Sequence, residues 1–160
     1  MEPTRHALSR SGPAVRAALR AAGWYAGREF DTRDWEAMLS GVGYAVPEWA
    51  VRIWRELGAL TISSSADRRP SSSLRIDPVV ACIDSVDESR LLSAHYGSLF
   101  VPLGMWSIQF RSYIAESGLV VAVGPKVVWK LGETLAEALA YVVDGDGSAS
   151  RATKAEWLSP

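Results

Sequence analysis

The N-terminal third of the chain places its apolar side chains three and four positions apart, the spacing that lines one face of a helix. Three such runs span residues 13–23, 31–43 and 47–58. Each run ends at a glycine, the residue that most easily adopts the left-handed turn after a helix. The first and third runs open with a proline, and Asp31 or Thr32 can cap the second. The pattern predicts three amphipathic helices in succession.

After these helices the pattern shortens to the alternation of β-strands. The segments LTISS, residues 60–64, and SLRIDP, residues 73–78, each predict a short strand. The polar residues 65–73 between them predict a hairpin or a mobile loop. The Asp-Pro pair that ends the second segment opens a helical stretch that runs in pieces to Tyr96 and stops at Gly97.

Four β-rich runs follow, separated by short segments that contain glycine. The runs span residues 99–104, 107–115, 119–123 and 126–131. Consecutive strands joined by short turns are typical of an antiparallel meander. A final helix is predicted over residues 134–145, where Thr134 and Glu137 have the spacing of a capping box.

Helices followed by a strand meander and a closing helix predict a single α+β domain, with N-terminal helices packed on an antiparallel sheet. We assign this domain to residues 13–145 and an N-terminal arm to residues 1–12. The polar residues 146–160 predict a frayed C-terminal tail, in which Trp157 can dock.

Composition narrows the range of partners. The 160 residues include 17 basic and 18 acidic side chains, a net charge of -1, so the chain lacks a polybasic surface for nucleic acid or membranes. Cys82 is the single cysteine and only two histidines accompany it, which excludes an internal disulfide and a tetrahedral Cys/His zinc site. The N-terminal residues lack the apolar core of a signal peptide, and no run approaches a membrane span. We therefore expect a cytoplasmic protein without a cofactor or a metal.

The stretch GWYAGR concentrates glycines, aromatics and an arginine directly after the first predicted helix. Gly23 and Gly27 allow the backbone to reverse, and Trp24 can enter the core beside the helix end. Arg28 can donate to helix carbonyls, pair with a carboxylate such as Asp31, or face an anionic ligand. We favour the architectural interpretation, in which Trp24 and Arg28 pin the first helix to the sheet.

Catalytic signatures are weak in this chain. His95 lies near a predicted helix end without a nucleophile motif beside it, and Cys82 lies among apolar residues that favour an inert, buried thiol. We find no P-loop, dinucleotide fingerprint, nucleophile elbow or HExxH helix. The chain is therefore predicted not to be an enzyme, and a catalytic or small-molecule site around Arg28, His95 and Tyr96 is the less favoured alternative.

Seven tryptophans are more than a core of this size requires, and tryptophan is enriched at binding hot spots. Trp106 and Trp129 lie in or beside predicted strands, so one face of the sheet can expose them. The acidic residues Asp84, Asp87 and Glu88 gather near a predicted helix start. They either stabilise the helix dipole or form a negative patch for a basic partner.

Several short motifs follow one another in a fixed order along the chain. The most specific is GW-x-x-GR, formed by Gly23, Trp24, Gly27 and Arg28. Pro102 and Gly104 follow in the middle strand, and a G-x-T-x-x-E-A-L segment closes the series at Gly132, Thr134, Glu137, Ala138 and Leu139. In this order and spacing, the chain from Pro13 to Gly145 resembles the third family of the SUKH superfamily of bacterial immunity proteins.

The resemblance implies an α+β fold with helices on an antiparallel sheet, and work by binding rather than by catalysis. Members of the superfamily neutralise a cognate polymorphic toxin, often a nuclease or a deaminase, in the cytoplasm of the producing cell. Because such toxins tend to have basic clefts, we expect Trp106 and Trp129 to anchor the toxin, with Asp84, Asp87 and Glu88 as an acidic rim. The alternative implied by the same superfamily is a regulatory or scaffolding interaction module.

Overall fold

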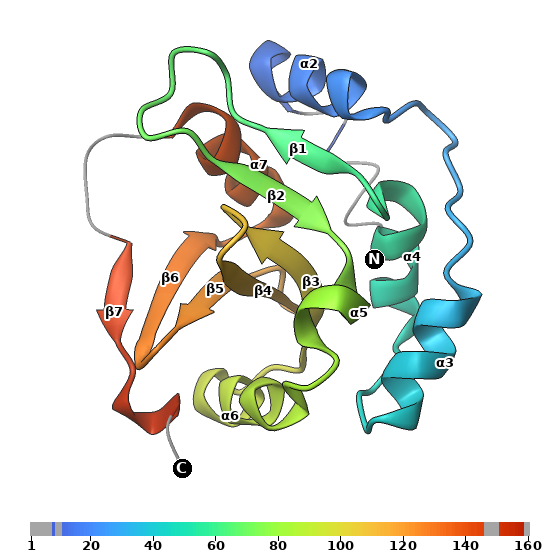
Figure 1. Cartoon of the computed structure of the whole chain (residues 1–160), viewed down its shortest axis with the longest axis vertical. Coiled ribbons are helices and arrows are strands. Elements are labelled where there is room, and N and C mark those ends of the chain that lie inside the picture. Colours follow the sequence, from blue (N-terminus) through green and yellow to red (C-terminus); the bar gives the residue numbers. More distant parts are fainter. Residues whose placement is uncertain (1–7, 9–10, 146–150, 159–160) are drawn as a thin grey trace.

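The computed structural model of the protein describes residue 8, residues 11–145 and residues 151–158 (Figure 1). The helices are α2 (Pro13–Ala22), α3 (Arg33–Gly41), α4 (Glu48–Leu57), α5 (Pro78–Cys82), α6 (Val86–Tyr96), α7 (Leu135–Asp144) and the 3-10 helix η1 (Glu156–Leu158). The strands are β1 (Thr61–Ser63), β2 (Ser73–Ile76), β3 (Phe100–Trp106), β4 (Phe110–Ala115), β5 (Val120–Gly124), β6 (Val127–Gly132) and β7 (Ala152–Lys154). The predicted α+β class is confirmed.

The strands form one seven-stranded sheet in the order β1 to β7, in which every neighbouring pair is antiparallel. The predicted four-run meander is confirmed as β3 to β6. The two earlier strands extend it on one edge, and β7 extends it on the other. Apolar residues from the sheet and from the surrounding helices form one continuous core.

Helices cover the sheet on both faces. α7 packs against β6 and also reaches β1 and β2, and α2 lies over β1 and α7. α5 and α6 pack against β3. In Figure 1, α3 and α4 follow the right side of the molecule and α6 lies below the sheet.

The GWYAGR stretch holds the first helix to α4. Gly23 and Gly27 have φ angles of 111° and 82°, in the left-handed region that favours glycine. Arg28 donates from Nη1 to the carbonyl of Glu56 at 2.9 Å and from Nη2 to the carbonyl of Gly58 at 2.7 Å. The interpretation that Arg28 satisfies carbonyls at a helix end is thus confirmed, and Asp31 pairs with Arg33 instead.

The expected anchor on the sheet is wrong. Trp24 is half-buried and donates from Nε1 to the carboxylate of Glu56 at 3.4 Å, so it also contacts α4. α4 itself reaches the sheet through the buried Trp54, whose Nε1 donates to the carbonyl of Pro102 at 3.1 Å. The GWYAGR stretch therefore contacts α4, and α4 in turn contacts the sheet.

Gly104 allows β2 and β3 to approach each other closely. A Cβ atom at this position would lie 1.7 Å from the carbonyl oxygen of Arg75, which no side chain can tolerate. The pairing of β3 with β4 shifts between Pro102 and Gly104, as at a β-bulge. Gly104 therefore lies inside a strand that continues to Trp106, and does not end it as the sequence pattern suggested.

The expectation of a frayed C-terminal tail is wrong for residues 151–158. β7 pairs with β6 through Val127 and Lys154, and the indole of Trp157 stacks on the His95 ring at 3.9 Å. Residues 146–150 and 159–160 of the predicted tail lie outside the described residues, as do residues 1–7, 9 and 10 of the predicted arm. Leu8 of that arm is buried in the core.

The predicted mobile loop between β1 and β2 is tied to α7. The amide of Ser65 donates to the carbonyl of Val143 at 2.9 Å, and Arg68 Nε donates to the carbonyl of Tyr141 at 3.0 Å. The guanidinium of Arg68 is buried, and its Nη1 donates to the carbonyl of Pro70. These contacts place the loop beside the C-terminal end of α7.

Candidate protein-binding surface

Four aromatic side chains gather where the face of the sheet beside α7 meets the end of that helix. Phe110 and Trp129 have ring centroids 4.5 Å apart, and the Trp106 ring lies 5.6 Å from Phe110 and 5.8 Å from Trp129. Tyr141 of α7 completes the group, with its ring 6.2 Å from that of Trp106. We call Trp106, Phe110, Trp129 and Tyr141 the aromatic cluster.

The register of the sheet explains why these rings meet. Trp106 pairs directly with Phe110 across the β3–β4 hairpin, and directly paired residues point to the same face. Trp129 pairs with Ala122, which in turn pairs with Ser112, so it shares a face with Phe110 two residues away.

The prediction of an exposed Trp106 is wrong. This indole is only 8% exposed, and its Nε1 donates to Ser72 Oγ at 2.9 Å, because β2 lies directly beside it. Trp129 is half-exposed. Its ring lies over Gly124, where a Cβ atom would come within 2.9 Å of it.

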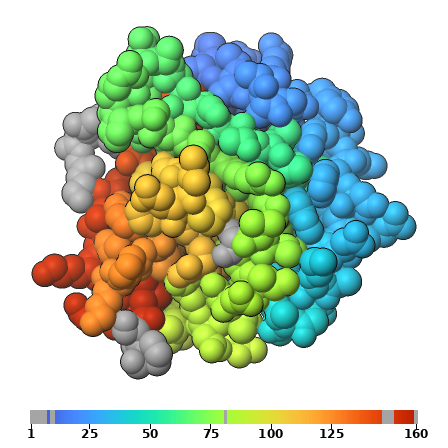
Figure 2. Space-filling view, in the orientation of Figure 1, coloured from blue at the N-terminus to red at the C-terminus, as the bar shows by residue number. Residues whose placement is uncertain are grey.

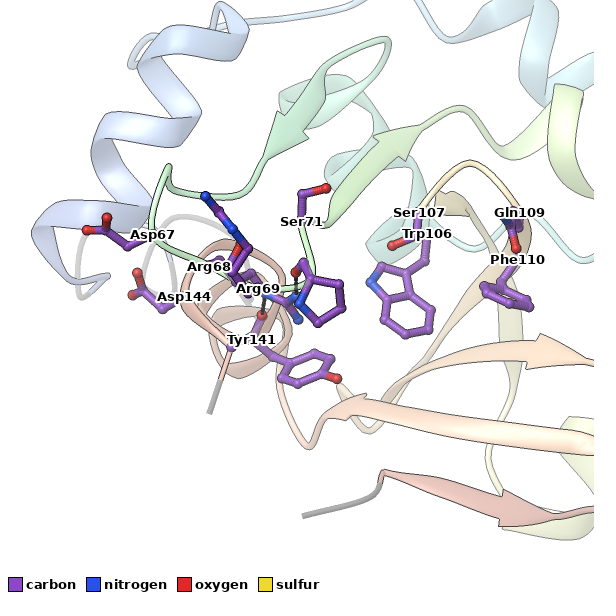
Figure 3. Close-up of a pocket in the computed structure, with 12 residues that line it drawn as sticks. Asp67, Arg68, Arg69, Ser71, Trp106, Ser107, Gln109, Phe110, Tyr141 and Asp144 are labelled. Atoms are coloured by element: carbon purple, nitrogen blue, oxygen red, sulfur yellow. Dashed lines mark hydrogen bonds between the residues drawn. The ribbon is translucent and has the colours of Figure 1, made fainter. Parts of the chain in front are cut away.

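A pocket of about 710 Å³ opens beside the cluster, between α7, the β1–β2 loop and the β3–β4 turn (Figure 3). Its lining residues are Asp67, Arg68, Arg69, Pro70, Ser71, Trp106, Ser107, Gln109, Phe110, Tyr141, Asp144 and Gly145. In Figure 3 the Tyr141 ring points from α7 toward Trp106, across the space between them. The pocket is therefore aromatic on its floor and polar on its rim.

Two arginines flank the Tyr141 ring, and both make contacts within the protein. The guanidinium carbon of Arg68 lies 5.0 Å from the ring centroid and that of Arg151 lies 4.0 Å from it, both within cation–π range. Arg151 also donates from Nη1 to the carbonyl of Leu131 at 2.9 Å. Tyr141 thus joins α7 to the β1–β2 loop and to the segment before β7.

The two acidic side chains at the pocket rim, unlike these arginines, make no such internal contacts in the described part of the chain. Asp67 and Asp144 are exposed, and neither carboxylate has a hydrogen bond or an ion pair within the described part of the chain. Both lie at the end of the pocket away from Phe110 (Figure 3). This end of the pocket therefore offers acceptors to a partner, while the nearby Arg68 donates to backbone carbonyls.

The predicted acidic rim at the start of α6 does not join the aromatic cluster. Glu88 accepts from Arg111 Nε and Nη2, each at 2.7 Å, and from the Tyr113 hydroxyl at 2.6 Å. Arg111 and Tyr113 alternate with Phe110 along β4 and so point to the opposite face. The five predicted partner-binding residues therefore lie on two sides of the sheet.

Glu88 is also less available than predicted, because its side chain is 17% exposed and fully engaged in this ion pair. Asp84 and Asp87 are exposed, and Asp87 contacts Arg90 at 3.4 Å. Asp87 and Glu88 occupy the first turn of α6, where negative charge is stabilised by the helix dipole.

The residues considered for catalysis do not form one site. Arg28 donates to the α4 end, whereas His95 and Tyr96 lie against Trp157. Cys82 is buried, and burial raises the pKa of its thiol well above the ordinary value of 9.0. No group of three metal-ligating side chains occurs among the residues that the structure describes.

Sequence reasoning missed Phe110, Tyr141 and the flanking arginines. One signal was present: Tyr141 lies off the apolar stripe of α7 formed by Leu135, Ala138, Leu139 and Val142, so the helix places it at the edge of the core and only partly buries it. The other members depend on which strands pair, and the sequence pattern alone does not give this register.

A comparison with protein-family models matches residues 12–145 to a family described as SUKH-3 immunity protein. The match runs from the residue before α2 to the residue after α7. Comparisons with curated proteins and with solved structures give no match. Within the described residues, no helix has the length and apolar character needed to cross a membrane.

Proposed function

The chain belongs to the SUKH-3 immunity protein family, and on that premise we propose that it binds and neutralises a cognate polymorphic toxin, a nuclease or a deaminase, in the cytoplasm. The observation that carries this proposal is the family match over residues 12–145, which includes every element from α2 to α7. An immunity protein of this kind acts by occupying a surface of its toxin and needs no catalytic group of its own.

The surface that supports this function best is the aromatic cluster with the adjacent pocket. A stable protein complex buries about 800 Å² on each partner, with aromatic side chains and arginine enriched at its centre. The cluster supplies the half-exposed rings of Phe110, Trp129 and Tyr141 on a rigid sheet and helix. Trp129 thus keeps its proposed role in toxin binding, and Asp84 and Asp87 remain a separate candidate patch.

Co-expression with the toxin domain of the neighbouring reading frame tests the function. The chain should restore growth of cells that produce the active toxin, and it should form an equimolar complex with a catalytically inactivated toxin domain. Isothermal titration then gives the affinity. Cell death despite abundant folded immunity protein, with no detectable complex, would reject the proposal and favour a regulatory interaction module instead.

A further inference from the structure

The turn between β3 and β4 has an unusual backbone for its sequence. Ser107 and Ile108 have φ angles of 52° and 70°, both in the left-handed region. Glycine and asparagine adopt this region readily, whereas a β-branched residue such as isoleucine is a genuine outlier there. The turn thus holds Ile108 in a conformation that its own side chain disfavours.

Burial of the Ile108 side chain does not offset this conformation. The Ile108 side chain is 82% exposed, the highest fraction among the large apolar residues of the described chain that are exposed. In Figure 2 the β3–β4 turn forms a yellow knob that stands between the green β1–β2 loop and the orange strands. Strained residues tend to occur at functional sites, where the surrounding structure holds them in place.

The base of the turn is held firmly in place. The Ser107 amide donates to the carbonyl of Ser73 at 2.7 Å, and the hydroxyls of Ser72 and Ser107 lie 3.5 Å apart. Ser72 Oγ also accepts from Trp106 Nε1 at 2.9 Å. Because β2 fixes the turn through these bonds, little conformational entropy is lost when Ile108 meets a partner.

The turn also forms one wall of the pocket. Its residues Ser107 and Gln109, on either side of Ile108, both line the pocket, and the exposed carboxylates of Asp67 and Asp144 lie at the other end. The exposed side chain of Ile108 therefore lies next to a pocket that has an aromatic floor and two available carboxylates. Its charge complements a partner that presents a basic side chain near an apolar recess.

We propose that Ile108 is the central apolar contact with the toxin, entering a recess of the toxin domain while Asp67 and Asp144 receive a basic side chain beside that recess. This inference rests on the proposed function and names the surface that performs it. The occupant is the toxin domain itself, whose nucleic-acid substrate requires a basic cleft if it is a nuclease or a deaminase that acts on nucleic acid.

The test compares Ile108→Asn with the matched variant Val80→Asn. Val80 on α5 is also an exposed aliphatic residue, 72% exposed, and it does not line the pocket. Titration of the inactivated toxin domain should show an affinity about 30-fold weaker for Ile108→Asn, as for a binding hot spot, and a nearly unchanged affinity for Val80→Asn. Because asparagine tolerates a positive φ, the melting temperature of Ile108→Asn should equal or exceed that of the wild type.

Two results of the titration and melting experiments would each overturn the inference. One is an unchanged toxin affinity of Ile108→Asn, provided that the wild-type chain binds the toxin. The other is a clearly lowered melting temperature, which would give Ile108 a structural role. If the wild-type chain neither binds nor neutralises the toxin, the proposed function itself fails. Loss of a wild-type dimer in Ile108→Asn, seen by light scattering without toxin, would reassign the turn to self-association and also overturn the proposal.

Discussion

The two faces of β4 differ in how they use their side chains. Arg111 and Tyr113 point toward α6, where Glu88 accepts hydrogen bonds from both and closes the interface. Phe110 points to the face beside α7, where it lies between Trp106 and Trp129 and lines an open pocket. One strand thus serves stability on one side and recognition on the other, because adjacent residues alternate between the two faces.

The difference arises from the helices rather than from the strand. α6 brings a carboxylate to the charged side chains of β4, and the polar groups on that face satisfy one another. α7 ends at Asp144, at the rim of the pocket, so it covers the core and leaves the aromatic cluster partly open. Each face therefore predicts a different response to mutation.

The face of β4 that packs against α6, which we call the closed face, should show the largest loss of stability on mutation. Glu88→Ala leaves Arg111 charged and unpaired, and it removes the acceptor of the Tyr113 hydroxyl, so the free energy of unfolding should fall by about 3 kcal/mol. Toxin affinity should not change. Urea denaturation gives the loss, with Asp87→Ala as control, because Asp87 is the adjacent residue but is 89% exposed. Equal losses in both variants would contradict the assignment of Glu88 to the closed face.

On the open face, Trp129→Ala should affect both stability and binding. The ring packs on Phe110 and lies over Gly124 but is half-exposed, so we expect a loss of about 2 kcal/mol in the free energy of unfolding, less than for a fully buried tryptophan. The control is Trp49→Ala, a half-buried tryptophan on α4 that lies outside the aromatic cluster. Both variants should lose stability, and only Trp129→Ala should lose toxin affinity by titration.

The buried thiol and tyrosine hydroxyls should make the stability of the protein fall in alkaline solution. Burial raises the pKa values of Cys82, Tyr44 and Tyr113, so the folded chain keeps protons that the unfolded chain releases. Stability is therefore fully present below the ordinary thiol value of 9.0 and is lost as the pH rises above it. For Cys82 alone the loss is about 0.8 kcal/mol between about pH 8 and about pH 9.5.

Urea midpoints across this pH interval measure the loss, and Cys82→Ala should reduce the dependence on pH. An equally steep fall in Cys82→Ala would show that another group carries the effect.

Local rules predicted much of the fold from the sequence. The glycines after α2 and the capping of α7 by Thr134 follow from what these residues do within a few positions. Arg28 was predicted to donate to carbonyls at a helix end, but the helix whose end it contacts is α4, which lies 28 or more residues away. β7 escaped notice because all three of its residues are exposed, so it pairs through its backbone and shows no apolar alternation.

The binding surface could not be predicted in the same way, because it depends on register. Whether an aromatic residue is exposed depends on its strand neighbours: Ser72 and the adjacent strand bury Trp106, while Gly124 provides space for Trp129. The prediction that the acidic residues lie beside the tryptophans was wrong for the same reason. Arg111 points to the opposite face of the sheet and pairs with Glu88 there. The positive φ of Ile108 has no signature in its sequence.

The smallest expected effect is on the rate of association with the toxin. It is measured by comparing two double variants, each of which removes two exposed carboxylates and therefore the same charge. Asp67→Asn with Asp144→Asn removes the acceptors at the pocket, and Asp84→Asn with Asp87→Asn removes those near the start of α6. Both double variants lose the same negative charge, so long-range attraction to a basic toxin should weaken equally in both. Only the first pair should slow association by a further factor of about three, because its carboxylates lie at the contact itself. Stopped-flow rates at low and high salt separate the long-range attraction, which salt screens, from the local contact at the pocket. A larger effect of the Asp84 and Asp87 pair would place the toxin-binding site on the α6 side instead.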